Sequence, residues 1–244
     1  MKTIRLLSTN ISDTTIEEVS HLLNTKTHLK VAICNANTLV RSHRKNAIRG
    51  VINSFDIATP DGFPVAKSVS KLAKKNIPRV DGYKVFLKTI EDGLKNNTSH
   101  FFYGSNKKIV KLMIGNLKRI YPEINIIGYS CPPNLSVEEL IADFKNTKPS
   151  SSPQITWVCL GFPKQELFIH SLNKEFDSTS NFVGIGAVFE WVAGTKVKAP
   201  EWMANLGLEW ILRLIQEPKR LFKRYLIDNT LFIYYFSKQL LFKN

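Results

Sequence analysis

The sequence predicts an α/β fold with a largely parallel β-sheet, followed by a helical C-terminal segment. Three observations support this prediction. Short apolar runs with strand character alternate with helix-like segments, several of these runs end at glycine, and strand-like runs stop at about residue 199. The chain has 244 residues, of which 43% are hydrophobic, so it is long enough to bury a substantial core.

The expected strands are apolar runs bounded by turn-forming residues, and they cover residues 28–34, 54–58, 100–103, 124–129, 155–160 and 181–188. Helical patterns fill the intervals, ending near residue 53, covering 65–75 and 107–121, and beginning near residues 136 and 164. Pro122 ends the helix over 107–121, and Ser136 with Glu139 forms a capping box that begins the next helix.

The C-terminal segment differs in composition from the rest. From Arg213 to Asn244 it contains seven Lys or Arg and two Asp or Glu, interleaved with aromatic residues. A basic helix with a wide aromatic face is typical of a helix at a membrane interface, although packing on its own domain would produce the same pattern. We therefore expect a Rossmann-like domain over residues 1–198 and a basic, amphipathic helical appendage over residues 199–244.

The net charge of +14 and the pI of about 9.7 indicate an anionic partner, which could be nucleic acid, a phosphate-rich ligand or a membrane surface. No apolar run approaches the ~20 residues of a spanning helix, and the N-terminus has no stretch typical of a signal peptide. Cys34, Cys131 and Cys159 are far apart, so we expect reduced thiols and a cytoplasmic location.

The stretch Ala58-Thr59-Pro60-Asp61-Gly62 has two interpretations. Pro-Asp-Gly is an ordinary turn sequence. A carboxylate between a strand and a helix of an α/β protein also lies where such folds place their chemistry. Local sequence alone favours the turn, but the two interpretations are compatible because a turn can present the carboxylate.

Other residues suggest a phosphate ligand. Glycines at four expected strand ends, including Gly128, would let a nucleotide approach the backbone, although each taken alone can be a tight turn. Arg213, Arg220 and Arg224 would lie within about 40° of one another on a continuous helix and could hold phosphate. Pro218 interrupts that helix, and a solvated basic face is the alternative. No HxH, HExxH or Asp-x-Asp pattern suggests a metal site.

Together these motifs resemble those of the WecG/TagA/CpsF family of glycosyltransferases. The matching segments follow the family's order from about residue 30 to residue 225, and they are Asn35–Val40, Thr59–Gly62, Arg79–Gly82, Phe101–Gly104, Gly161–Glu166, Gly184–Glu190, Ala199–Trp202, Gly207–Trp210, Arg213–Leu214 and Glu217–Pro218.

The resemblance implies roles for individual residues. Asp61 would be the general base of an inverting transfer, with Asn37 and Gln165 positioning sugar hydroxyls. Substrate and phosphate binding would fall to Asn35, Arg79, Arg213, Arg220 and Arg224. Nucleotide binding would fall to Gly104, Gly161, Gly184, Gly186 and Glu190. Family members usually have Asp at the last of these positions, so the longer Glu190 would need adjusted geometry.

The resemblance also implies the partners. The donor would be a UDP-sugar of the UDP-N-acetylmannosamine kind, and the acceptor a sugar on a polyprenyl diphosphate in cell-surface polysaccharide or teichoic acid synthesis. No metal or other cofactor is expected, because fixed guanidinium groups would stabilise the leaving diphosphate. The enzyme would lie peripherally on the anionic inner face of the bacterial plasma membrane. The sequence leaves open whether it forms a homo-oligomer.

Two other classes of function are compatible with part of the sequence. The charge would suit a nucleic-acid-binding protein, but the sequence has no recognised nucleic-acid motif. The strand-end glycines would suit a non-catalytic nucleotide-binding scaffold, but that role would not require Asp61, Asn37 and Gln165.

Overall fold

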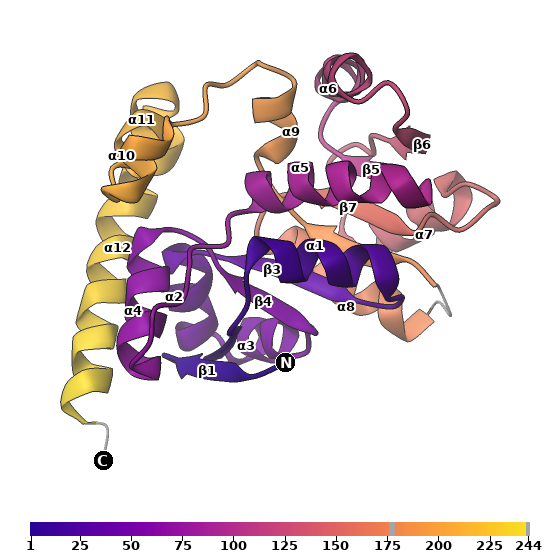
Figure 1. Ribbon diagram of the computed structural model, residues 1–244. Coiled ribbons are helices and arrows are strands. Elements are labelled where there is room, and N and C mark those ends of the chain that lie inside the picture. Colours follow the sequence, from indigo (N-terminus) through magenta and orange to yellow (C-terminus); the bar gives the residue numbers. More distant parts are fainter. Residues whose placement is uncertain (176–178, 243–244) are drawn as a thin grey trace.

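The computed structural model describes residues 1–175 and 179–242. Six strands form a parallel sheet in the order β4-β3-β8-β7-β5-β6 (Figure 1). They are β3 (Lys30–Cys34), β4 (Ile57–Pro60), β5 (Ser99–Gly104), β6 (Asn125–Ser130), β7 (Ile155–Cys159) and β8 (Asn181–Gly184). An antiparallel hairpin of β1 (Thr3–Leu6) and β2 (Thr9–Ser12) lies at the N-terminus.

Helices cover both faces of the sheet because side chains along a strand alternate between its faces. In β5, Phe101 and Tyr103 belong to one hydrophobic cluster and Phe102 to the other. The first cluster contains residues of α2 (Ala36–Arg44), α3 (Asn46–Asn53), α4 (Phe63–Ala73), α7 (Val137–Thr147) and α8 (Lys164–Glu175). The second contains residues of α1 (Ile16–Thr25), α5 (Gly82–Gly93), α6 (Lys107–Ile120) and α9 (Val188–Val192). A short 3₁₀ helix, η1 (Leu94–Asn96), follows α5.

The predicted α/β class and all six predicted strands are confirmed, and two strand ends differ from the prediction by more than two residues. The strand expected over residues 54–58 begins at Ile57. The strand expected over residues 181–188 ends at Gly184, because Gly186 has φ +55 and the chain then turns into α9. The capping box at Ser136 and Glu139 is present. The β1–β2 hairpin, α1 and α5 were not anticipated.

The C-terminal segment is helical, as predicted, and consists of α10 (Glu201–Asn205), α11 (Glu209–Gln216) and α12 (Pro218–Leu241). In Figure 1, α12 runs along one side of the molecule, where it packs against α2. Leu221 and Phe232 of α12 are buried, and the Gln239 side chain accepts a hydrogen bond from the Leu7 N–H (2.7 Å). The appendage is therefore docked on the sheet domain.

The prediction that Arg213, Arg220 and Arg224 share one face of a continuous helix is wrong, because Arg213 lies in a different helix from the other two. Arg213 belongs to α11 and Arg220 to α12, because the first helix ends before Glu217 and a new helix begins with Pro218 in its first turn. Among the described helices, none is both long enough and apolar enough to cross a bilayer. Cys34, Cys131 and Cys159 are free thiols.

Candidate active site

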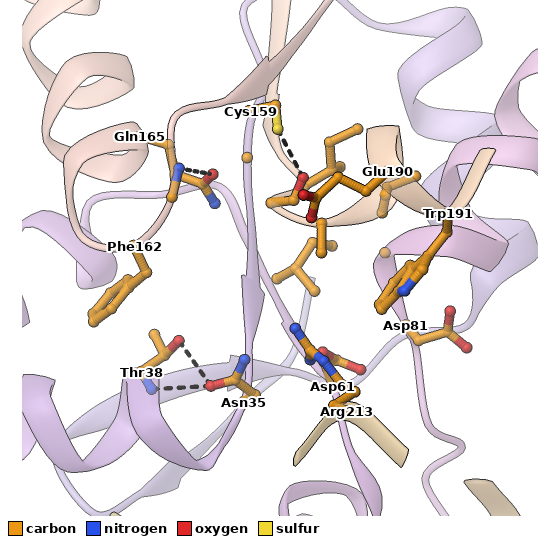
Figure 2. A pocket seen from close by; sticks show the side chains of 18 of the residues that line it. Asn35, Thr38, Asp61, Asp81, Cys159, Phe162, Gln165, Glu190, Trp191 and Arg213 are labelled. Carbon is orange, nitrogen blue, oxygen red and sulfur yellow. Dashed lines mark hydrogen bonds between the residues drawn. The ribbon is translucent and has the colours of Figure 1, made fainter. Parts of the chain in front are cut away.

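A cavity of about 400 Å³ opens at the carboxyl ends of the sheet strands (Figure 2). The chain leaves β5 toward one edge of the sheet and β7 toward the other, so the ends of these neighbouring strands form a topological switch point, where α/β folds bind ligands. Ser105 follows β5 and Gly161 follows β7, and both line the cavity. Asn35 after β3 and Asp61 after β4 line it from the other side.

Asp61 is held by the turn that the sequence predicted. Its N–H donates to the Cys34 carbonyl (3.0 Å), which ties the end of β4 to the end of β3. Gly62 follows with φ +82 and ψ 147, a conformation that essentially only glycine adopts, and α4 begins at Phe63. The turn thus directs the carboxylate of Asp61 into the cavity, where Figure 2 shows it beside Arg213.

A second, smaller cavity of about 100 Å³ meets the first at Asp61. Its walls come from the start of α4 and from the C-terminal helices, and they include Phe63, Pro64, Ala204 and Trp210. Asp61, Asn35, Arg79, Glu209 and Arg213 line both cavities. The carboxylate therefore stands between a polar cavity at the sheet and a more apolar one beneath the appendage.

The environment of Asp61 changes its acidity. Burial raises the pKa of this carboxyl from 3.8 to about 6, the guanidinium of Arg79 opposes that rise, and the charges of Glu209 and Asp81 add to it. An unperturbed aspartate ionises well below neutral pH. The raised pKa instead brings the carboxylate close to the value at which a general base is most effective near pH 7.

The amide of Gln165 is fixed at the start of α8. Its Oε1 accepts a hydrogen bond from the Gly161 N–H (3.2 Å), and its Nε2 donates to Glu166 Oε1 (2.8 Å). A Cβ at position 184 would lie 2.9 Å from Nε2, so Gly184 leaves room for the amide. Burial raises the pKa of Glu166 to about 7 although the bond from Gln165 lowers it.

Most of the described cationic side chains around the cavity form ion pairs with carboxylates. Arg79 lies 2.6 Å from Glu209, 3.6 Å from Asp61 and 3.7 Å from Asp81. The guanidinium of Arg213 lies over the Trp191 ring, 5.3 Å from its centroid, and forms no ion pair with another described residue.

A second group of charges surrounds Glu217. Lys196 contacts Glu190 (2.7 Å) and Glu217 (2.9 Å), and Arg220 donates two hydrogen bonds to Glu217. Glu209 and Glu217 belong to segments that carried the resemblance, but no role was inferred for them. Trp191 and Lys196 gave no sequence signal that could be used.

The remaining predicted residues are placed as follows. Gly161, Gly184, Gly186 and Glu190 line the main cavity. Gly104 is not among the residues that line this cavity. A glycine is required at this position because a Cβ would lie 2.3 Å from the Cys159 carbonyl oxygen.

Asn37, unlike the other two predicted catalytic residues, Asp61 and Gln165, does not line the main cavity. Asn37 lines the second cavity and donates a hydrogen bond to Asp228 of α12. Asn35 caps α2 by accepting from the Thr38 N–H (3.2 Å), and it lines both cavities. The side chain of Arg224 lies outside the described part of the structure. Within the described residues, no three His, Cys, Asp or Glu side chains form a metal-binding group.

Comparison with known proteins gives the family of the chain. The model of the glycosyl transferase WecG/TagA/CpsF family matches residues 4–244. The chain belongs to this family, and it is therefore a glycosyltransferase.

Two relatives carry the same description, N-acetylglucosaminyldiphosphoundecaprenol N-acetyl-beta-D-mannosaminyltransferase. The protein from Bacillus subtilis (strain 168) is 30% identical over 201 residues, which cover 82% of this chain and 76% of the relative. The protein from Bacillus spizizenii (strain ATCC 23059 / NRRL B-14472 / W23) is 34% identical over 174 residues, covering 70% of this chain and 64% of the relative.

Proposed function

We propose that this glycosyltransferase moves a hexose-type sugar, of the N-acetylmannosamine kind, from a UDP-sugar to a sugar on a polyprenyl diphosphate. The carrying observation is that Asp61 lines both cavities. The names of the two Bacillus relatives support the same acceptor class and the same transferred sugar. The main cavity suits the nucleotide because it lies at the switch point of the sheet, and the second cavity suits the acceptor sugar.

In this mechanism the acceptor hydroxyl attacks the anomeric carbon of the donor. A bond forms between the acceptor oxygen and that carbon, the carbon–diphosphate bond breaks, and UDP leaves with its electron pair. Asp61 takes the hydroxyl proton. A single displacement from the opposite side inverts the anomeric centre, so an inverting reaction needs one base and no covalent intermediate.

The charge on the leaving diphosphate requires stabilisation. Arg213 and Arg220 line the main cavity, and Arg213 has no carboxylate partner among the described residues, so its guanidinium is available to phosphate oxygens. Lys196 and Arg220 would exchange Glu217 for the diphosphate when donor binds. We propose that these cations act without a metal.

The test is release of UDP from a panel of UDP-sugars with an N-acetylglucosaminyl diphosphate-lipid acceptor. We expect release only when the acceptor is present and equal rates with EDTA or added Mg²⁺. The matched variants are Asp61→Asn and Glu123→Gln, and the second removes an exposed carboxylate from the turn between α6 and β6. Full turnover by Asp61→Asn, or dependence on Mg²⁺, would contradict the mechanism.

We further propose that the enzyme binds peripherally to the inner face of the bacterial plasma membrane through its C-terminal helices. Large apolar side chains remain exposed on these helices and at the end of α10, including Trp202 (60%), Leu206 (64%), Ile233 (63%) and Leu241 (77%). Exposed aliphatic and aromatic groups beside lysine and arginine favour an anionic lipid surface. Such binding would bring the second cavity, which these helices help to form, close to a lipid-linked acceptor.

A further inference from the structure

A third hollow of about 510 Å³ lies between α2 and α12, and we call it the α2–α12 groove. Cations line both of its walls. Arg41, Arg44 and Lys45 come from the end of α2, and Arg220 and Lys223 come from the start of α12. Among the described residues that line it, Asp228 is the only acidic one.

The α2 wall follows from helical spacing. Asn37, Arg41 and Arg44 are separated by four and three residues, so their side chains project from one face of α2. The guanidinium of Arg41 is also fixed, because it lies over the Phe162 ring at 5.3 Å from the centroid. Cations in the last turn of a helix interact favourably with the helix dipole. That interaction does not require them to face the cations of α12.

The groove differs from the main cavity in the state of its cations. In the main cavity Arg79 and Lys196 each contact at least two carboxylates. In the groove, Arg41, Arg44, Lys45 and Lys223 form no ion pair with another described residue. Like charges gathered without counterions repel one another, and an anion of high charge would relieve that repulsion.

The groove also adjoins both cavities of the candidate active site. It shares Asn37 and Asp228 with the second cavity, and Phe162 and Arg220 with the main one. A sugar in the second cavity would therefore have its own diphosphate next to the groove. Ile227 lines the groove and is 39% exposed, and Phe222 and Leu226 of the same helix are 60% and 61% exposed. These side chains offer an apolar path for a hydrocarbon chain.

We propose that the α2–α12 groove binds the diphosphate of the lipid-linked acceptor, chiefly through Arg41, Arg44, Lys45 and Lys223. This inference rests on the proposed function. It assigns the acceptor diphosphate to a different set of cations from the donor diphosphate, so the two anions do not compete for Arg213.

The test uses the full-length protein and a double variant, Arg44→Ala with Lys45→Ala, whose two side chains are exposed. The control is Lys118→Ala with Arg119→Ala, which removes two exposed cations from the last turn of α6. Binding of farnesyl diphosphate and farnesyl monophosphate is measured without turnover, and KM values for donor and soluble acceptor are measured with turnover.

We expect the groove variant to weaken farnesyl diphosphate binding and raise the acceptor KM by about tenfold, the loss expected from removing one or two charge-assisted contacts. Its donor KM should stay within about twofold of that of the unmodified chain, and its affinity should depend less on salt. The control should match the unmodified chain in all these measurements. The unmodified chain should prefer the diphosphate to the monophosphate, and the groove variant should lose that preference.

Three results would overturn the proposal. Equal behaviour of the groove and control variants would show that the groove cations are not used. A groove variant with a raised KM for the donor and an unchanged KM for the acceptor would show that these cations bind the donor. Lost binding to phosphatidylglycerol vesicles with unchanged farnesyl diphosphate binding would assign them to lipid headgroups. If the unmodified chain releases no UDP, the proposed function fails, whereas the binding measurements still decide what the groove holds.

Discussion

The side chain of Asp61 is 20% exposed, and its carboxylate lies 3.6 Å from Nε of Arg79. Even so, its pKa is raised to about 6, because burial outweighs the attraction of Arg79 and because Glu209 and Asp81 add negative charge. At the scale of single residues, a group placed for proton transfer is thus also a group whose ionisation opposes folding.

The first prediction concerns the pH dependence of transfer. A base must be deprotonated to act, so kcat/KM should fall as pH drops through about 6, the pKa of Asp61. In Glu209→Gln the acid limb of the pH–rate profile should move to lower pH, because the variant removes a charge that raises this pKa and frees Arg79 from its 2.6 Å partner. A pH–rate profile with an unmoved limb would exclude Asp61 as the titrating base.

The second prediction concerns stability. The folded pKa of Asp61, about 6, lies above the ordinary pKa of 3.8, so the folded chain holds the proton more tightly. The associated stabilisation is present below about pH 4 and is lost as pH rises through 6. Asp61→Asn should therefore increase the free energy of unfolding at pH 7.5 by up to about 3 kcal/mol. Urea titrations at several pH values check this, and the gain should shrink steadily toward pH 4.

At the scale of elements, the turn before α4 depends on one backbone conformation. The third prediction is that Gly62→Ala lowers the free energy of unfolding by about 1–3 kcal/mol, because φ +82 with ψ 147 strains any residue with a Cβ. The variant should also reduce turnover, because Asp61 immediately precedes this residue.

Gly50→Ala is the matched control for this prediction. Gly50 lies inside α3, and a Cβ there meets no heavy atom within 4 Å. Alanine should stabilise that helix by about 0.5–1 kcal/mol. Chemical denaturation of both variants separates the effect of the turn from that of a general Gly-to-Ala change, and equal effects at the two positions would contradict it.

At the scale of the whole molecule, α12 has one buried and one exposed side. Phe232 is 2% exposed and packs into the first hydrophobic cluster, whereas the next residue, Ile233, is 63% exposed. The fourth prediction is that Phe232→Ala lowers the free energy of unfolding by about 3–5 kcal/mol and Ile233→Ala changes it by less than about 0.5 kcal/mol. A similar small effect from both would mean that α12 is not docked as described.

The fifth prediction separates docking from membrane binding. Ile233→Ser combined with Leu241→Ser removes two exposed apolar side chains of α12 without touching its buried side. We expect weaker co-sedimentation with anionic vesicles and unchanged UDP release from a soluble acceptor. Undiminished vesicle binding would show that these residues are not part of the membrane-binding surface.

Local patterns determined much of this protein. Apolar runs, four of them with glycine at or near the end, located the six sheet strands, the Ser136 capping box began α7, and Pro218 began α12. These signals are visible in the sequence because they depend on residues a few positions apart. The same kind of signal at α1, a capping box of Thr15 and Glu18, was available and was not used.

Packing decided the rest. Asp61, Gln165 and Arg213 line one cavity because the carboxyl ends of β4 and β7 and the helix α11 converge there, whereas Asn37 turns toward Asp228. The ion pair of Arg79 with Glu209 joins residues more than a hundred positions apart. The raised pKa of Asp61 arises chiefly because folding removes its carboxyl from solvent. The sequence alone determined which chemical groups exist and which segments become strands and helices. Tertiary structure decided which charges meet and how far each is removed from water, because Coulomb energy and desolvation depend on distance in space and on burial.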